Sequence, residues 1–307
     1  MTSVSTASLP DVTGDLSAFR DVDVIALDVD GTLLHGTASE VAERFVQLHR
    51  LLATHRFPVD FVLVTGRPWA GVRAVVRAFE AAAARRAPHV VHFGSVVTDR
   101  AGNGALHRTS IPATVVREVA DVYRSHGLAP SIIECRDDLA ETHWNVGGKD
   151  PAATYDFGVP IRTVDRVPRA VDAQAVLAST SAAVAAGVLA DLGGLGAGLP
   201  MEYHAPSGIL YVDSPGASKS DGLTAALAQL GASPERTVAV GDSEPDIAMF
   251  RTARIGVAVG SADAAVIDAA DFVCRAGPSD AVIELLEVVH AARGLAPATR
   301  TGVPGVR

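Results

Sequence analysis

Short apolar runs alternate with amphipathic stretches along most of the chain. Mostly apolar runs with β-branched members lie at residues 24–27, 60–64 and 237–240, and each is followed by a polar loop. Runs of this kind are typical of strands that are buried on both faces of a parallel sheet. The stretches between them carry apolar residues every three or four positions, which predicts helices that connect one strand to the next. The pattern therefore predicts an α/β fold around a parallel sheet.

The same rhythm predicts further elements on both sides of a long middle segment. Additional strands are expected at residues 89–92, 255–259 and 272–274. Helices are expected where a residue that favours a helix start precedes a periodic stretch. The predicted helices begin after Ser39 (apolar at Val41, Phe45, Leu48 and Leu52), at Pro68 (apolar at Val72, Val75, Val76 and Phe79), shortly before Leu223, after Ser261 and after Pro278.

The rhythm changes between about residue 95 and residue 205, where we expect a separate α+β domain inserted into the core. Its predicted elements, with the strands at its exit, are two short strands around the turn Gly102–Gly104, helices at 112–126 and 182–192, and strands at 131–134, 173–178, 201–204 and 209–213. The expected boundaries are residues 20–94 and 206–293 for a discontinuous core, 95–205 for the inserted domain, and 1–19 and 294–307 for flexible tails.

The composition excludes several classes of function. Of the 307 residues, 48% are hydrophobic, which is enough for a sizeable core. Lys and Arg total 26 against 35 Asp and Glu, and no long basic stripe occurs, so nucleic acid is not an expected partner. Cys135 and Cys274 form no CxxC pair, so we expect no disulfide or thiolate-bound metal, and a reducing compartment such as the cytoplasm. The amino terminus lacks a signal-peptide pattern, and the Ala- and Gly-rich stretch 173–199 is too polar for a membrane span.

Polar side chains follow three of the predicted strands. Asp28 and Asp30 come after the first, Thr65 after the second and Asp242 after the third, while Lys219 precedes a helix. The carboxyl ends of parallel strands share one edge, which is where open α/β sheets bind ligands. An isolated Asp-Gly-Thr is most often a turn, and an isolated Lys before a helix is most often a surface charge. Because four such segments occur in order, we favour a functional site over coincidence.

These segments resemble the signature of the haloacid dehalogenase superfamily of phosphotransferases. The resemblance rests on Asp28-Val29-Asp30-Gly31-Thr32, Thr65, Lys219 and Gly241-Asp242-Ser243-Glu244-Pro245-Asp246, and it covers about residues 22–290. It implies a Rossmann-like parallel sheet core with an inserted α+β cap domain. A cap between Thr65 and Lys219, with Met201-Glu202-Tyr203-His204 before the Ser218-Lys219 step, is similar to the Cof-like, type IIB members. In those proteins the cap closes over the site and selects the substrate.

The resemblance implies a role for each acidic residue. Asp28 is expected to be the nucleophile that forms an aspartyl phosphate, and Asp30 to be the general acid and base. The cofactor implied is Mg²⁺, held by Asp28, the main-chain carbonyl of Asp30, and Asp242. Asp246 is expected one layer further out, or bound to the ion through water.

The resemblance also implies residues that bind the phosphoryl group. Thr65 and the amide of Gly66 are expected to donate hydrogen bonds to its oxygens, and Lys219 to neutralise its charge. The expected function is a Mg²⁺-dependent phosphomonoester hydrolase for a small phosphorylated metabolite, such as a sugar phosphate. Two alternatives stay open: a phosphomutase or phosphotransferase that passes the phosphoryl group to an acceptor sugar, and a non-catalytic regulatory protein that binds a phosphorylated ligand.

Two positions depart from the pattern of the family. Pro245 stands where Asn is common, and Phe93-Gly94-Ser95 where Asn-Gly-Ala is common. Proline suits the first turn of a helix, so we expect the backbone to be kept at Pro245. His35 either approaches a substrate or is a polar loop residue, of which we favour the second, and the other histidines lack the spacing of a zinc site. Candidate substrate contacts in the cap are residues 141–145 and 193–198, which packing or a surface loop explains equally well.

Overall fold

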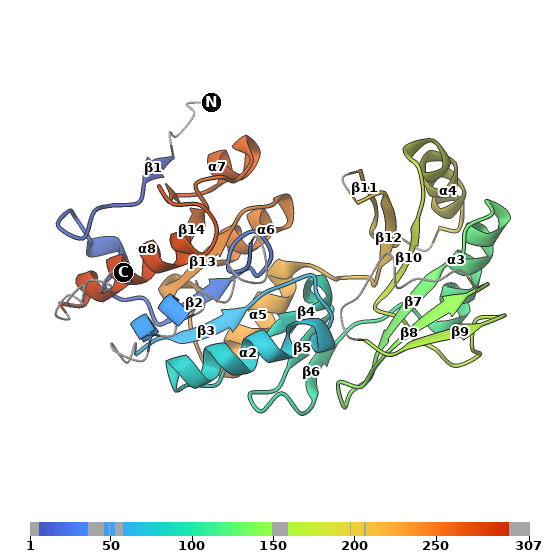
Figure 1. Ribbon diagram of the computed structural model, residues 1–307, viewed down its shortest axis with the longest axis horizontal. Coiled ribbons are helices and arrows are strands. Elements are labelled where there is room, and N and C mark those ends of the chain that lie inside the picture. The colour runs from blue at the N-terminus through green and yellow to red at the C-terminus, as the bar shows by residue number, and fades with distance from the viewer. Residues whose placement is uncertain are drawn as a thin grey trace, which may run out of the picture. The chain divides into compact units, whose positions relative to one another are not determined.

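The computed structural model of the protein describes residues 6–35, 46–48, 50–52, 58–148, 159–196, 198–205 and 207–294. The chain divides into two compact units, and most of their elements are labelled in Figure 1. The first unit comprises Met1–Leu63, Arg77–Ala87 and Leu227–Arg307, and the second comprises Val64–Val76 and Pro88–Ala226. The segment expected as a cap, residues 95–205, lies wholly within the second unit.

A six-stranded parallel sheet forms the centre of the first unit (Figure 1). Its strands, in order across the sheet, are β1 (Ala7–Ser8), β15 (Phe272–Val273), β14 (Ile255–Ala258), β13 (Thr237–Gly241), β2 (Val24–Leu27) and β3 (Asp60–Leu63). All neighbouring strands in this order are parallel. Every residue of β2, β13 and β14 is buried, as their uninterrupted apolar runs predict. The predicted α/β fold with a parallel core is confirmed.

Helices of the first unit follow the predicted rhythm. They are α6 (Glu244–Thr252), α7 (Ala264–Ala269) and α8 (Asp280–Ala292), and α6 packs against β13 and β14. One predicted start is wrong: α7 begins after Asp263, which occupies the N-cap position that we expected for Ser261. The helix expected after Ser39 lies partly outside the described residues, although residues 46–48 and 50–52 are helical.

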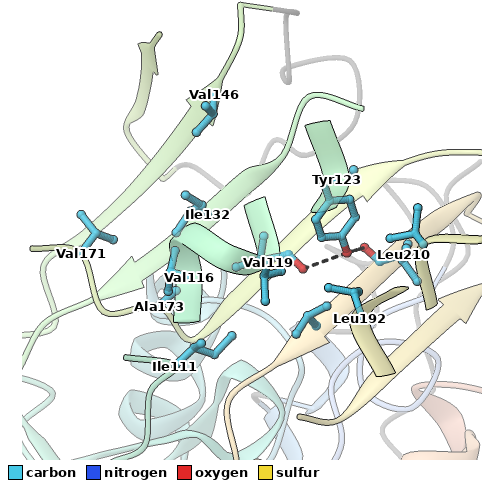
Figure 2. Packing of buried hydrophobic residues seen from close by; sticks show 14 of the residues in the cluster. Ile111, Val116, Val119, Tyr123, Ile132, Val146, Val171, Ala173, Leu192 and Leu210 are labelled. Atoms are coloured by element: carbon cyan, nitrogen blue, oxygen red, sulfur yellow. Dashed lines mark hydrogen bonds between the residues drawn. The ribbon is translucent and has the colours of Figure 1, made fainter. Parts of the chain in front are cut away.

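The second unit contains a mixed six-stranded sheet with two helices on one face. The order of its strands is β11 (Met201–His204), β12 (Ile209–Asp213), β10 (Ala175–Ser179), β7 (Ser131–Cys135), β8 (Glu141–Val146) and β9 (Ile161–Val164). The helices α3 (Ala113–Ser125) and α4 (Ala182–Gly194) pack on a cluster of buried residues from this sheet (Figure 2). Within it the Tyr123 hydroxyl donates a hydrogen bond to the Leu210 carbonyl at 3.1 Å. The sequence predicted these elements except β8 and β9.

Other elements of the second unit surround the segment 90–94. A small antiparallel sheet joins β4 (Val90–Val91), β5 (Val96–Thr98) and β6 (Ala105–Arg108). The strand expected at 89–92 is shorter than predicted, because the backbone turns at His92 and Phe93, whose φ angles are 51° and 53°. Two helices belong to both units: α2 (Trp69–Ala83) and α5 (Lys219–Leu230).

Residues 6–19, which we expected to be a flexible tail, are built into the first unit. Strand β1 pairs with β15, and the amide of Leu9 donates to the carbonyl of Val273 at 2.8 Å. The side chains of Leu9 and Phe19 are buried. A two-residue strand has no periodicity to reveal it, which is why the sequence pattern missed it. The remaining tail residues, 1–5 and 295–307, lie outside the described residues.

Across the part of the chain that the structure describes, no helix combines the length and the apolar character that crossing a bilayer requires.

Candidate active site

Three of the predicted acidic residues converge beyond the central strands of the first unit. Asp28 follows β2, Asp242 follows β13, and Asp246 lies in the first turn of α6. Carboxylate oxygens of the three residues lie within 4.8 Å of one another. Because β2 and β13 are neighbours, their chain ends meet at one edge, and the Asp28 amide donates to the Val240 carbonyl at 3.0 Å. Asp28 is only 3% exposed, so this edge presents its carboxylate from a buried position.

The loop after β2 orients Asp242. Thr32 is fully buried, and its Oγ1 donates to Oδ1 of Asp242 at 2.9 Å. Gly31 has a φ angle of +81°, and a Cβ at this position would overlap the Asp242 carboxylate. The motif Asp-Gly-Thr therefore does more than turn the chain, since its glycine and threonine hold a carboxylate that comes from residue 242.

Asp246 organises the loop that carries Asp242. Its Oδ2 accepts hydrogen bonds at 3.0 Å from the amides of Asp242 and Ser243 and from the Ser243 hydroxyl. Gly241 makes room for this carboxyl group, because a Cβ there would overlap it. Pro245 lies in the first turn of α6, as its position in the sequence predicts, and the helix begins normally.

Asp30 and His35 differ from Asp28 in exposure. Both residues are exposed, and the turn between them is closed by a hydrogen bond from the Gly31 amide to the Leu34 carbonyl at 2.9 Å. The amide and hydroxyl of Ser279, just before α8, donate to the carbonyls of Thr32 and Leu33 at 2.7 and 2.9 Å. The loop after β2 is therefore fixed from two sides, by β13 and by the start of α8.

Thr65 and Gly66 belong to the second unit and begin the loop before α2. The Thr65 amide donates to the Val90 carbonyl at 2.9 Å, and its own carbonyl accepts from the Phe93 amide at 3.1 Å. Its Oγ1 accepts from the Arg67 amide at 3.1 Å, which leaves the hydroxyl hydrogen for another acceptor. A Cβ on Gly66 would overlap the ring of Phe93, so this glycine permits the close approach of that ring.

Lys219 is the first residue of α5 and is 4% exposed. The residue before it, Ser218, has its carbonyl so close to Gly94 that a Cβ there would overlap it. Gly222, one turn into α5, is similarly close to Val90 and Gly94. The segment 90–94 therefore contacts both the start of the Lys219 helix and the loop that contains Thr65 and Gly66.

The candidate cap contacts fall on two different kinds of structure. Residues 141–145 lie in β8, where Glu141, His143 and Asn145 are buried on one face of the sheet. Residues 193–198 follow the end of α4, and residue 197 lies outside the described residues. Contact of either stretch with a substrate stays a prediction.

The sequence of the chain matches one family of known proteins over most of its length. Residues 25–286 match the haloacid dehalogenase-like hydrolases. A phosphoglycolate phosphatase of Methanoculleus marisnigri is 38% identical over 90 residues, which are 29% of this chain and 38% of that protein. A phosphoglycolate phosphatase of Methanosarcina acetivorans is 35% identical over 81 residues, or 26% of this chain and 36% of that protein. The chain thus spans little more than a third of the length of these curated relatives.

Solved structures share the fold. A haloacid dehalogenase-like hydrolase of Bacteroides thetaiotaomicron superposes with a TM-score of 0.70 at 20% identity, covering 88% of this chain and 98% of that one. A sugar phosphatase of subclass IIB in the same superfamily gives a TM-score of 0.63 at 19% identity, covering 84% and 95%. At these identities the likeness concerns the fold.

Proposed function

Since the chain belongs to the haloacid dehalogenase-like hydrolases, we propose that it is a Mg²⁺-dependent phosphomonoester hydrolase that works through an aspartyl phosphate. The observation that carries the proposal is the convergence of Asp28, Asp242 and Asp246 at the ends of neighbouring parallel strands. Four acidic and polar segments in family order, on strand ends and helix starts, support the same conclusion.

Asp28 and Asp30 divide the chemistry between them. Asp28 attacks phosphorus and displaces the leaving oxygen, and Asp30 donates a proton to that oxygen. Asp30 then takes a proton from the water that hydrolyses the aspartyl phosphate, which restores both carboxyl groups. Their surroundings suit these roles, because Asp28 is buried and held by a backbone hydrogen bond, whereas exposed Asp30 can exchange protons with solvent.

The three carboxylates fit a hard divalent cation. Oxygen is the donor that Mg²⁺ prefers, and the separations of up to 4.8 Å between these oxygens suit ligands of one ion. When bound, Mg²⁺ offsets the negative charge that accumulates where carboxylate and phosphate meet. Asp28 and Asp242 are the proposed direct ligands, with the Asp30 carbonyl, and Asp246 supports Asp242 through the loop amides.

Thr65, Gly66 and Lys219 are proposed to bind the phosphoryl group. The Thr65 hydroxyl has a hydrogen to donate, and Lys219 brings a positive charge at the start of a helix. The substrate class we propose is a small phosphorylated metabolite, which phosphoglycolate and sugar phosphates exemplify in the named relatives. With two free buried cysteines, we propose the cytoplasm as its compartment.

The test is turnover of a panel of phosphate esters with Mg²⁺ and with EDTA. We expect release of inorganic phosphate that EDTA abolishes, and loss of about 10³-fold or more in Asp28→Asn with an unchanged near-UV spectrum. The exposed helix residue Asp268, changed to Asn, serves as the control and keeps full activity. Undiminished turnover by Asp28→Asn contradicts the mechanism. Transfer of phosphate only to an added sugar identifies a phosphotransferase, and binding without turnover identifies a regulatory protein.

A further inference from the structure

Glu141 receives three hydrogen-bond donors inside the second unit. Its Oε1 accepts from the Trp69 amide at 2.6 Å, and its Oε2 from the Ala70 amide at 2.7 Å. These are the first amides of α2, which have no partners within the helix, so the carboxylate satisfies them and complements the helix dipole. Oε1 also lies 2.6 Å from Nε2 of His92. Glu141 comes from β8, far along the chain, and its side chain is 2% exposed.

His92 belongs to a segment that holds the loop before α2. We call residues 90–94 the clamp segment and residues 65–68 the Thr65 loop. Besides the two bonds to Thr65, the His92 amide donates to the Arg67 carbonyl at 2.9 Å. The clamp segment therefore fixes the first half of the Thr65 loop, and Glu141 fixes the amides that follow it. The bond between His92 and Glu141 links these two supports to each other.

The backbone of the clamp segment adopts a conformation that costs free energy. His92 and Phe93 both have φ near +50°, which is uncommon for residues other than glycine and is least expected at a bulky residue such as Phe93. Such outliers persist where the surrounding structure fixes them, and they concentrate at functional sites. In this conformation the His92 ring reaches Glu141 while the Phe93 ring covers Gly66.

A metal site is the rival explanation for the same side chains. Ligand atoms of His92, Cys135 and Glu141 lie within 4.8 Å of one another. Cys135, however, stands directly opposite Glu141 in the β7–β8 register, which alone accounts for its nearness. Burial, and then the charge of Glu141, raise the pKa of the Cys135 thiol, so in the absence of a metal it stays protonated. The three donors on Glu141 account for its carboxylate without a cation.

We infer that Glu141 and His92 are positioning residues, which act through the Thr65 loop to hold the Thr65 hydroxyl and the Gly66 amide in the geometry that binds a phosphoryl group. This inference rests on the proposed function for the identity of the ligand. Neither residue touches substrate in it. The six-stranded sheet of the second unit thus contributes, through β8, to phosphate affinity as well as to any selection of the leaving group.

A double-mutant cycle tests the inference, with inorganic phosphate as the probe and calorimetry in the presence of Mg²⁺ as the readout. Glu141→Gln places an amide where two backbone donors need an acceptor, and we expect its phosphate Kd to rise about tenfold, within the loss that a 1 Å misplacement causes. Thr65→Ala also weakens binding. In the double variant, Glu141→Gln is expected to add clearly less than about tenfold, because the share of its effect that passes through the Thr65 hydroxyl is already lost.

Two further variants keep the test independent of folding. His92→Asn retains a residue that tolerates positive φ and removes the ring, and it is expected to weaken phosphate binding in the same direction. Glu134→Gln changes a glutamate of the same sheet that accepts a hydrogen bond from the Trp144 indole, and it should leave the phosphate Kd unchanged. On p-nitrophenyl phosphate, Glu141→Gln is expected to raise KM and the inhibition constant of phosphate in parallel.

Several outcomes overturn the inference. An unchanged phosphate Kd in folded Glu141→Gln, or effects that multiply in the double variant, would remove the link to Thr65. Stoichiometric Zn²⁺ binding that Cys135→Ser and His92→Asn both abolish would identify His92, Cys135 and Glu141 as a metal site. If the wild-type protein binds phosphate without turnover, the proposed function fails while the cycle still decides the positioning role; if it binds none, both are overturned.

Discussion

A glycine sets the position of one carboxylate in the acidic site. Gly31 combines a φ of +81° with a carboxylate, that of Asp242, where a Cβ would lie. We predict that Gly31→Ala lowers Mg²⁺-dependent turnover by about 10²-fold, because Asp242 must move. The backbone alone should cost about 1–2 kcal/mol of unfolding free energy, measured by urea denaturation.

Gly127→Ala is the matched control for this substitution. Gly127 has a φ of +72°, and a Cβ there would meet nothing within 4 Å. It should therefore show the backbone cost without the loss of turnover. Equal turnover in the two variants would mean that contact with Asp242 is unimportant.

The sequence indicated which single residues form the candidate site better than it indicated their hydrogen-bond partners. The motif predicted Asp28, Asp242 and Asp246 as a group, and the structure brings their carboxylates together. Thr32 received no role, although it stands in the same motif, because its bond to Asp242 joins residues 210 positions apart. The pairing of Glu141 with His92 was equally hidden, although Glu141 lies in a candidate stretch, because nothing local in either segment indicates the other.

Among the elements, strand β12 carries a carboxyl group that should make stability depend on pH. Burial, and then the charge of Glu202 on neighbouring β11, raise the pKa of Asp213 to about 7. Between about pH 4 and pH 7, the folded protein therefore keeps a proton on Asp213 that the unfolded chain, with an ordinary pKa near 3.8, has lost. The contribution of Asp213 to stability falls as pH rises from about 4 to about 7.

Asp213→Asn is predicted to remove the contribution of Asp213 to the pH dependence of folding stability. Thermal melts at pH 5 and pH 8 should show a smaller fall in Tm for this variant than for the wild-type protein. The control Asp165→Asn, at an exposed residue, should show the same fall in Tm as the wild-type protein. A parallel fall in all three proteins would mean that Asp213 titrates normally.

Strand β8 shows why one element escaped prediction. A half-buried strand is normally recognised by apolar residues at alternate positions. In β8 the alternation exists, but the buried positions include Glu141, His143 and Asn145, so the hydropathy pattern conceals it. Hydrogen bonds to distant amides compensate the burial of Glu141, and only the tertiary structure reveals them.

For the whole molecule, the converging carboxylates predict a linkage between metal binding and stability. Mg²⁺ at ten times its Kd should stabilise the folded state by about 1.4 kcal/mol, which raises Tm by about 3 °C. Asp242→Asn should abolish this increase and, without metal, raise Tm slightly, because it relieves repulsion among the three carboxylates. Differential scanning fluorimetry measures both effects.

NaCl at matched ionic strength is the control, since the chain carries a formal charge of -9 that any salt screens. A rise in Tm that NaCl reproduces, or that survives in Asp242→Asn, would contradict a specific site.

At this scale the sequence predicted the parallel core and the α+β composition of the inserted segment, because buried strands and amphipathic helices leave strong periodic patterns. Pairings between remote segments leave no periodic pattern in the sequence. The order of strands in the core, with β1 at one edge, depends on contacts between residues more than 260 positions apart.

The short strand β1 also bears on how copies of the protein behave in concentrated solution. An open sheet edge offers backbone amides and carbonyls to any extended chain, which is a common route to aggregation and to exchange of segments between molecules. Ala7 and Ser8 occupy those groups on β15, and Leu9 adds a further hydrogen bond. Residues 7–9 thus cover the edge of β15, and removing them would leave the backbone groups of that strand open to pairing with another chain.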